Sequence, residues 1–268
     1  MRNPRKGVYT SLTMLIGAWL LASAGCQEPQ VSDDVDTTAS EMPIEATEEA
    51  AENKPALVEI STQFGPMIVQ LSDSTPQHRD NFLKLVEEEY YDGLIFHRVI
   101  QDFMIQGGDP QSRGASLNTR LGSGGTGYTI EAEIRPDHIH AKGALAAARQ
   151  GDNVNPERRS SGSQFYIVQG RPFGANELDG IEGRIANFAQ EYGNGLANVE
   201  NGQFVNSDEA REAYMTAGGT PFLDMQYTVF GQVVSGLAIV DSIASVQTDR
   251  QRGDRPQQDV VMSMKRIQ

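Results

Sequence analysis

The stretch that most constrains the fold runs from Phe96 to Asp109 and reads FHRVIQDFMIQGGD. Two short apolar runs, residues 94–100 and 103–105, flank the polar pair Gln101-Asp102. Apolar runs of this length around a polar pair predict two strands joined by a tight turn. Taken alone, the pattern fits equally well an edge hairpin whose only cation, Arg98, is solvated.

Alternation along each strand decides which side chains of this hairpin share a face. Neighbouring residues of a strand point to opposite faces. Arg98 is therefore expected on one face with Phe96 and Ile100, and Gln106 is expected to share a face with Met104. The hairpin thus carries a cation, an amide and large apolar side chains within a short span.

This stretch resembles the signature of the cyclophilin-type peptidyl-prolyl isomerases, which carry FHRVI, two further residues, and FMIQGGD. A second block, residues 144–149 followed by 161–167, resembles the second signature of that family. A third block, residues 222–231, resembles its third signature. Three ordered blocks form a highly specific match, which covers residues 56–268 with one large interruption.

Composition limits the partners that this chain can have. The 268 residues carry a formal net charge of −14, and a nucleic-acid phosphate backbone requires a basic surface. Nucleic acid is therefore not expected as a partner. The single cysteine, Cys26, excludes an internal disulfide.

Residues 1–26 are predicted to be a signal peptide with a lipobox-like end. Three basic residues precede an uncharged, largely apolar run over 8–24, and small residues stand directly before Cys26. We therefore expect an exported lipoprotein, acylated on Cys26 and anchored to a membrane facing the periplasm or the cell exterior. Ser23 departs from the lipobox pattern, which usually has Leu there. An ordinary signal peptide and a retained membrane helix are the alternatives.

Residues 27–55 are predicted to be a disordered acidic tether. Nine acidic residues precede the first basic one, Lys54, and the sparse apolar residues show no period. Such a segment cannot bury enough surface to offset its ordering entropy, and its like charges extend it. A specific acidic docking site is the alternative.

The folded domain is expected over residues 56–268. Thr75 as N-cap with Pro76 at the first helical position predicts a helix that Gly93 closes. A second helix is predicted to start at Ser235 or Gly236. Together with the runs 94–100 and 103–105, the predicted strands are 57–61, 67–71, 144–149, 164–169, 228–233 and 259–267.

Many short strands separated by turns rich in Gly and Pro indicate a mainly β fold with a closed barrel. The family resemblance implies an eight-stranded antiparallel closed barrel capped by two helices. In such a fold the ligand groove lies on the outer wall, since the interior is packed.

The main departure from the family is an insertion at about residues 171–220. Apolar residues at helical spacing near 185–192 and a segment at 208–215 predict helices, and a structureless loop of this length is improbable in a compact domain. We expect a helical insertion packed beside the groove. A decorative surface insertion is the alternative.

The resemblance also implies a chemistry. An X–Pro amide has a rotation barrier of about 18–20 kcal/mol, and a donor aimed at the prolyl nitrogen favours the twisted amide over either planar form. Arginine suits this role because it stays charged and presents several fixed donors. By resemblance, the catalytic residues are Arg98, Gln106 and Phe103.

The same resemblance assigns substrate binding, with Gln106 and Gln164 holding the substrate backbone together with the main chain of Ala148 and Arg149. The apolar socket and its rim are assigned to Phe103, Met104, Tyr166, Leu223, Phe222 and Tyr227.

Four of these positions differ from the best-known family pattern and look like the bacterial branch. Tyr166 stands where Phe is frequent, which is expected to put a hydroxyl at the pocket edge. Arg149, Phe222 and Tyr227 stand where Asn, Trp and His are common.

No cofactor and no metal ion are expected. His138 and His140 could be two metal ligands, but no further His or Cys completes a recognisable motif. Residues 152–155 resemble part of a calcium loop without its Gly and terminal Glu, and a turn is the simpler interpretation.

Two functions remain open from the sequence. The first is a monomeric peptidyl-prolyl cis-trans isomerase that acts on Pro-containing unfolded or extended polypeptides and assists the folding of exported proteins. The alternative is a non-catalytic lipoprotein, a chaperone or assembly module, that binds Pro-containing segments. Intact Arg98, Gln106 and Phe103 favour the enzyme, because binding alone needs no donor aimed at the prolyl nitrogen.

Overall fold

The computed structural model describes residues 54–192, 199–200 and 203–268. The expected signal peptide with Cys26, and nearly all of the expected tether, lie outside the described residues. Among the described residues, no helix is both long and apolar enough to span a membrane.

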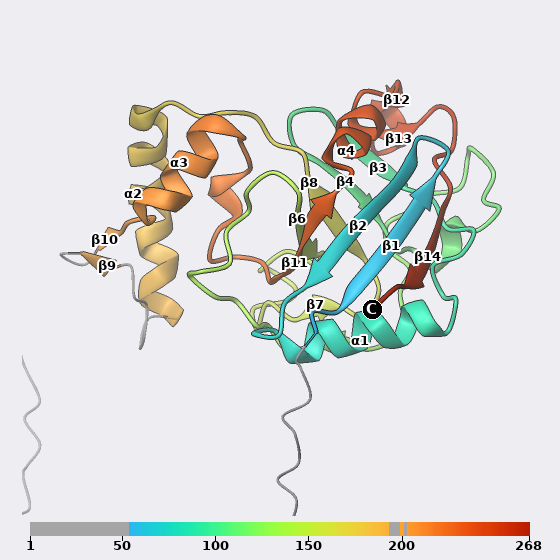
Figure 1. The fold of residues 1–268 in the computed structure, drawn as a ribbon, viewed down its shortest axis with the longest axis horizontal. Coiled ribbons are helices and arrows are strands. Elements are labelled where there is room, and N and C mark those ends of the chain that lie inside the picture. The colour runs from blue at the N-terminus through green and yellow to red at the C-terminus, as the bar shows by residue number, and fades with distance from the viewer. Residues whose placement is uncertain (1–53, 193–198, 201–202) are drawn as a thin grey trace, which may run out of the picture. The chain divides into compact units, whose positions relative to one another are not determined.

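The domain is organised around one curled antiparallel sheet of eight strands (Figure 1). Its strand order is β14-β1-β2-β11-β6-β8-β4-β3. Six of these strands correspond to predicted runs from the first half of the domain and its centre, and two to the C-terminal part. The strands are β1 (Leu57–Thr62), β2 (Gly65–Leu71), β3 (Arg98–Ile100), β4 (Met104–Gly107), β6 (Ala144–Ala147), β8 (Phe165–Val168), β11 (Val229–Ser235) and β14 (Met262–Arg266).

The sheet does not form the closed barrel that was expected. Its two edges are β14 and β3, and no ladder between these two strands is present in the described part of the chain. The chain just before β3 meets the start of β14 through an isolated bridge between Ile95 and Val261, which does not extend into a ladder. The observed architecture is a mainly β half-barrel.

The main core fills the concave side of this sheet. In β1 and β2 every second side chain is buried, including Val58 and Ile60 from one strand and Met67 and Val69 from the other. This alternation has the period of a strand with one face toward the core. Helices α1 (Pro76–Glu87) and α4 (Leu237–Ala244) cover the two ends of the core, as expected (Figure 1).

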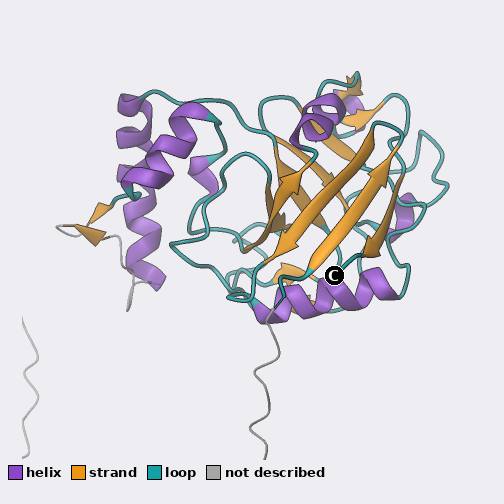
Figure 2. Cartoon of the chain, in the orientation of Figure 1, coloured by secondary structure: helices purple, strands orange, loops and turns teal. Residues whose placement is uncertain are grey.

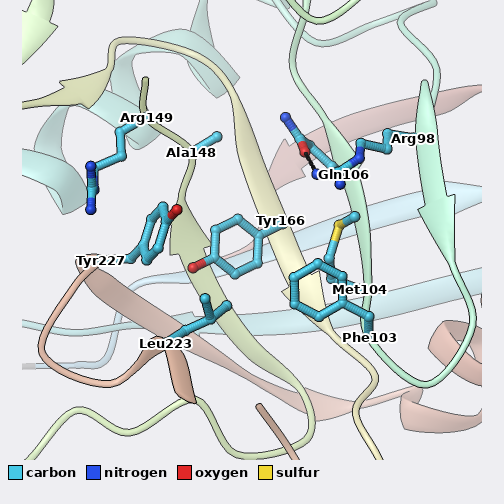
Figure 3. A pocket seen from close by; sticks show the side chains of 9 residues that line it. All are labelled: Arg98, Phe103, Met104, Gln106, Ala148, Arg149, Tyr166, Leu223 and Tyr227. Atoms are coloured by element: carbon cyan, nitrogen blue, oxygen red, sulfur yellow. Dashed lines mark hydrogen bonds between the residues drawn. The ribbon is translucent and has the colours of Figure 1, made fainter. Parts of the chain in front are cut away.

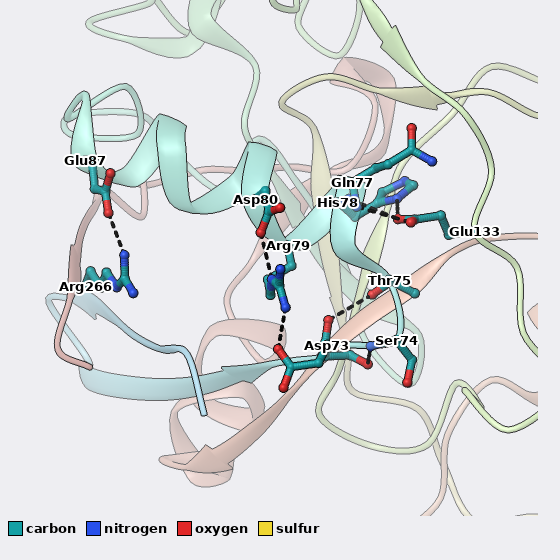
Figure 4. Close-up of polar contacts among 11 residues, drawn as sticks. Asp73, Ser74, Thr75, Gln77, His78, Arg79, Asp80, Glu87, Glu133 and Arg266 are labelled. Carbon is teal, nitrogen blue, oxygen red and sulfur yellow. Dashed lines mark hydrogen bonds and ion pairs between the residues drawn. The ribbon is translucent and has the colours of Figure 1, made fainter. Parts of the chain in front are cut away.

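Helix α1 is capped by a residue distant in sequence. Thr75 occupies the N-cap position, but its side chain makes no capping hydrogen bond. Instead the carboxylate of Glu133 accepts the backbone N–H groups of Gln77 at 3.1 Å and His78 at 3.0 Å (Figure 4). The carboxylate also lies 2.6 Å from His78 Nδ1. A carboxylate at this end satisfies free N–H groups and complements the helix dipole.

The end of α1 differs from the prediction that Gly93 closes it. The helix ends at Glu87, and Glu89 takes the left-handed conformation with φ of 54°. The N–H of Tyr90 then bonds to the carbonyl of Leu85, and that of Glu89 to Val86. This is a Schellman ending with a glutamate in place of the usual glycine.

The insertion is helical, as predicted, and forms a small core of its own. Helices α2 (Ala175–Tyr192) and α3 (Asp208–Thr216) stand beside the sheet (Figure 2). Helix α2 begins about ten residues before the predicted segment, and the Ser207 side chain caps α3 by accepting the N–H of Ala210. The chain leaves and returns at one place, since Gly219 N–H donates to the carbonyl of Arg171 at 3.1 Å. The buried apolar residues of this second core are Phe173, Leu178, Ile181, Ile185, Phe204, Tyr214 and Met225.

Three short antiparallel ladders and three 3-10 turns complete the described chain. The ladders pair β5 (Thr129–Ile130) with β7 (Ser160–Ser161), β9 (Val199–Glu200) with β10 (Gln203–Phe204), and β12 (Thr248–Asp249) with β13 (Arg255–Pro256). The turns are η1 (Pro110–Ser112), η2 (Pro221–Leu223) and η3 (Arg250–Arg252).

Candidate functional site

The register of the sheet lines up the predicted site residues in one row. Arg98 of β3 pairs with Gln106 of β4, Gln106 pairs with Tyr166 of β8, and Tyr166 pairs with Ala146 of β6. Paired residues of adjacent strands point to the same face. The tight turn at Gln101-Asp102 fixes the pairing of β3 with β4, and the register of the other strands extends it. The row lies on the outer face of the sheet, because the main core packs against the opposite face.

This row forms the floor of a pocket of about 150 Å³. Its walls come from β3, β4 and β8, from the chain just after β6, and from the segment that follows the insertion (Figure 3). The lining residues are Arg98, Phe103, Met104, Gln106, Ala148, Arg149, Tyr166, Leu223 and Tyr227. All nine were singled out from the sequence.

The polar end of the pocket is a chain of oriented side chains. Arg98 Nη1 donates to Gln106 Oε1 at 3.4 Å, and Gln106 Nε2 donates to Gln164 Oε1 at 3.1 Å. Gln164 in turn donates to the carbonyl of Gly124 at 2.7 Å. Within the described part of the chain, Gln106 is the one hydrogen-bond partner of the Arg98 guanidinium. The other N–H groups of Arg98 are therefore available to a bound molecule.

A buried carboxylate supports this chain from behind. Asp109 accepts the N–H groups of Gly122 at 2.5 Å and Gly124 at 3.3 Å, and its other oxygen accepts the N–H of Gln111. These bonds hold the Gly-rich loop so that the Gly124 carbonyl meets Gln164. A side chain at position 124 would place its Cβ 2.1 Å from Asp109 Oδ1, so the Asp109 carboxylate would have to shift from the loop that it holds. The sequence contained Asp109 within the first signature but gave it no role.

The apolar end of the pocket is made by rings and aliphatic side chains. The Phe103 ring lies 5.8 Å from that of Phe222, which is 41% exposed and flanks the pocket without lining it. Tyr227 meets Tyr166 edge-on at 5.9 Å. Met104 is buried beneath them. The result is an apolar hollow beside a cation, open to solvent on the outside of the sheet.

Arg149 and Ala148 line the pocket, and both also make hydrogen bonds to neighbouring segments of the chain. The Arg149 guanidinium donates to the carbonyl of Gln226 at 2.9 Å, pairs with Asp152, and lies 4.5 Å from the centroid of the Tyr227 ring. The N–H of Ala148 donates to the carbonyl of Gln164 at 2.9 Å. The Ala148 N–H group is thus already used, and substrate binding by the Ala148 main chain stays a prediction.

The hydroxyl of Tyr166 was expected at the pocket edge, and the structure corrects this. Only the ring faces the pocket, while the hydroxyl points away from Arg98 and Gln106 (Figure 3). Its oxygen lies 3.0 Å from Nε2 of His140, a fully buried side chain. Burial raises the pKa of Tyr166 well above its ordinary value, so the group stays a neutral phenol.

The histidine beside Arg98 is an uncharged neighbour. His97 is buried, and neither ring nitrogen has a hydrogen-bond partner among the described residues. Burial lowers the pKa of His97 to about 4, opposed in part by Asp109 and assisted by Arg98. Arg98 is thereby left as the cation of this end of the pocket at neutral pH.

The two histidines considered as metal ligands have other partners. His138 Nε2 lies 2.7 Å from Ser72 Oγ, and His140 Nδ1 lies 2.9 Å from Asp224 Oδ1. Over residues 54–192, 199–200 and 203–268, no group of three or more His, Cys, Asp or Glu side chains is placed to hold a metal ion.

Comparison with known proteins gives consistent matches. A family model described as cyclophilin type peptidyl-prolyl cis-trans isomerase/CLD matches residues 57–266. A putative bifunctional phosphatase/peptidyl-prolyl cis-trans isomerase of Streptococcus pyogenes serotype M6 is 38% identical over an alignment of 213 residues that covers 76% of this chain and 37% of that protein. A putative peptidyl-prolyl cis-trans isomerase of Staphylococcus haemolyticus is 34% identical over 206 residues, 76% of this chain and 87% of that protein.

The solved structures agree at the level of the fold. A crystal structure of a Cryptosporidium parvum cyclophilin type peptidyl-prolyl cis-trans isomerase has a TM-score of 0.53, with 21% sequence identity. The match covers 80% of this chain and 99% of that one. A crystal structure of the same protein in the presence of the dipeptide Ala-Pro has a TM-score of 0.52.

Proposed function

Because this chain belongs to the cyclophilin-type peptidyl-prolyl cis-trans isomerase family and has that activity, we propose that its outer pocket binds proline and that Arg98 drives the rotation. The observation that carries the proposal is the pairing of an apolar hollow with a guanidinium that keeps free N–H groups. The C. parvum relative crystallised in the presence of Ala-Pro shares this fold. A prolyl ring fits the hollow by its chemistry, since it is small, apolar and rigid.

Arg98 acts on the reacting amide in this proposal. When the X–Pro bond twists, the lone pair localises on the prolyl nitrogen and becomes able to accept a hydrogen bond. A donor at that point stabilises the twisted amide more than either planar form, which lowers the barrier without a covalent step. Gln106 holds the guanidinium through its Oε1 and is itself held by Gln164. The guanidinium is thereby oriented before the substrate arrives.

The remaining pocket residues bind the substrate. Phe103, Met104 and Leu223 surround the prolyl ring together with the face of Tyr166, while Tyr227 and Phe222 form the rim. Gln164 and the main chain of Arg149 hold the substrate backbone. Because the pocket is on the outside of the sheet, an extended polypeptide can cross it without threading through the protein.

The test separates rotation from binding. Arg98→Ala is expected to lower kcat/KM for a short X–Pro peptide by about two to three decades, or roughly 3–4 kcal/mol, with a much smaller change in peptide affinity. Arg98→Lys should rescue only partly, because an ammonium keeps the charge without the fixed fork of donors. Phe103→Ala is the contrasting variant, and it should weaken binding and rate together.

Exchange spectroscopy on the peptide gives the rate, calorimetry gives the affinity, and melting temperatures exclude damage to the fold. An equal loss of affinity and rate in Arg98→Ala would make Arg98 a binding residue. No acceleration by the unaltered protein would favour the non-catalytic binding module.

We further propose that the enzyme is an exported, membrane-anchored lipoprotein, attached through Cys26, which assists the folding of exported proteins as a monomer. The support is the sequence alone, with its basic start, apolar run and small residues before the cysteine. The acidic tether would hold the isomerase domain away from the membrane surface.

We also propose that the half-barrel behaves as a closed barrel in solution. The support is a set of irregular contacts between the chain before β3 and residues 260–262, where β14 begins. Phe96 N–H donates to the carbonyl of Val260 at 3.0 Å, and Met262 N–H to that of Leu94 at 2.8 Å. Slow hydrogen exchange at both amides is expected, and fast exchange at both would argue for an open edge.

A further inference from the structure

The insertion and the pocket are two apolar clusters joined by a buried polar chain. Tyr214 of α3 belongs to the core of the insertion, and Tyr166 belongs to the cluster that underlies the pocket. Between them lie Asp224 and His140, which are 2% and 0% exposed. Polar side chains buried between apolar clusters are costly unless each is hydrogen-bonded. The hydrogen-bond partners of these four side chains therefore show how the two clusters are connected.

Every link of this chain has hydrogen-bond geometry. Tyr214 donates its hydroxyl to Asp224 Oδ2 at 2.6 Å. Asp224 Oδ1 accepts the backbone N–H of His140 at 2.8 Å and lies 2.9 Å from His140 Nδ1. His140 Nε2 lies 3.0 Å from the Tyr166 hydroxyl, and the planes of the two rings are nearly parallel, with an interplanar angle of 12°.

The Asp224 carboxylate at the centre determines which group donates in each hydrogen bond. A carboxylate only accepts, so His140 Nδ1 must carry a hydrogen toward Asp224. In the neutral imidazole Nε2 is then an acceptor, and the Tyr166 phenol donates to it. Burial raises the pKa of both Tyr166 and Tyr214 well above the ordinary value, so both phenols keep their protons. The Tyr166 hydroxyl is thereby turned away from the pocket, and its ring presents an apolar face.

The same chain anchors the segment that closes the pocket. Asp224 directly follows Leu223, which lines the pocket, and Tyr227 lies three residues further on. The backbone N–H of Thr220 donates to the carbonyl of His140 at 2.8 Å. The carboxylate of Asp224 therefore connects the end of the insertion, the Tyr166 ring and the Leu223 wall.

We propose that Tyr214, Asp224 and His140 are positioning residues through which the insertion sets the shape of the proline socket. They touch no substrate and act on Tyr166 and Leu223. This inference rests on the proposed function only in taking Tyr166 as a wall of the socket. The insertion is then part of the specificity apparatus, and it orients a tyrosine so that the socket stays apolar.

The expected effect is a change in binding rather than in turnover. The socket contacts the prolyl ring in the planar and the twisted state alike, and uniform binding affects KM without changing kcat. Tyr214→Phe is expected to raise KM and the peptide Kd by about three- to tenfold and to leave kcat within about twofold. Arg98→Ala has the opposite signature, so failure of the inference and failure of the proposed catalytic role can be told apart.

A double-mutant cycle tests whether Tyr214 acts on the pocket through Tyr166. Tyr166→Phe and Tyr214→Phe each remove one hydroxyl from the chain, and the double variant is expected to bind peptide about as weakly as Tyr166→Phe alone, because both changes act through one element. Tyr91→Phe is the matched control, since Tyr91 is equally buried and its hydroxyl donates to the Ser163 carbonyl, outside the polar chain. Combined with Tyr166→Phe, this control is expected to be additive.

A spectroscopic measurement tests the same hydrogen bonds without any bound peptide. Imidazole 15N correlation spectra of the full chain should show a hydrogen on His140 Nδ1, and Tyr166→Phe should shift the Nε2 resonance. Additive effects of Tyr166→Phe and Tyr214→Phe, a Tyr214→Phe variant that loses only melting temperature, or a hydrogen on His140 Nε2 would each overturn the proposal.

Discussion

His97→Leu should remove an acid sensitivity that is built into the hairpin of the site. His97 is 4% exposed, and burial lowers its pKa to about 4 from the ordinary 6.5. In the unfolded chain the imidazole regains its ordinary pKa, so between pH 6.5 and 4 the unfolded state binds more protons than the folded state. Stability contributed by neutral His97 is therefore complete above about pH 6.5 and is lost as the pH falls toward 4.

The size of the effect follows from the difference between the two pKa values. A shift of about 2.5 units corresponds to about 3 kcal/mol once the pH is below both values. Between about pH 7.5 and about pH 5 the loss is about 2 kcal/mol, because His97 is then mostly protonated only in the unfolded state. His78 has a pKa lowered by burial as well, although Glu133 opposes that shift, and it contributes loss of the same sign.

Urea unfolding of the wild type and His97→Leu at these two pH values isolates the contribution of His97, since His78 and the carboxylates are common to both. Leucine has a similar volume and removes two ring nitrogens that lack partners among the described residues, so the variant should be no less stable at neutral pH. At about pH 5 it should gain about 2 kcal/mol over the wild type. The same difference between the two proteins at both pH values would refute the reasoning.

Three further predictions concern the anchor, the first helix and the loop behind the site. Cys26→Ser should move the protein from the membrane fraction to the soluble fraction, and an unchanged detergent partition would contradict acylation. Glu133→Gln should lower the free energy of unfolding by about 1 kcal/mol, measured in urea at neutral pH, because the charged cap of α1 is lost; full retention of stability would show that water caps the helix equally well. Gly124→Ala should raise KM and lower the melting temperature, because its Cβ would lie 2.1 Å from Asp109 Oδ1; unchanged kinetics would mean that the carbonyl at position 124 does not orient Gln164.

The hairpin that carries Arg98 was predictable because its determinants are local. Two apolar runs and a polar pair fix the turn, where Asp102 takes a φ of 60°, and the register follows from the turn. Arg98 then has to face Gln106. The helical character of the insertion was equally readable from spacing, because the apolar period of a helix survives without knowledge of what it packs against.

What the sequence did not reveal depends on residues far apart in the chain. His140 and Asp224 are 84 residues apart, and His78 and Glu133 are 55 apart. No local pattern connects such pairs, so neither the orientation of the Tyr166 hydroxyl nor the true cap of α1 was foreseen. Closure of the barrel also depends on residues far apart in the chain, because residues 94–96 meet residues 260–262 without forming a ladder between β3 and β14.

The neck of the insertion, where Arg171 and Gly219 lie side by side, has a consequence for how enzymes of this family can diversify. The chain departs at Arg171 and rejoins at Gly219 through a hydrogen bond between these two residues, whatever lies between them. Since the entropy of closing a loop grows only slowly with its length, a segment of different size can be spliced at this neck with little strain on the sheet. The strands that hold Arg98 can then remain unchanged while a different insertion changes the shape of the pocket wall at Leu223. Substrate preference can thus evolve separately from the residues that accelerate the rotation.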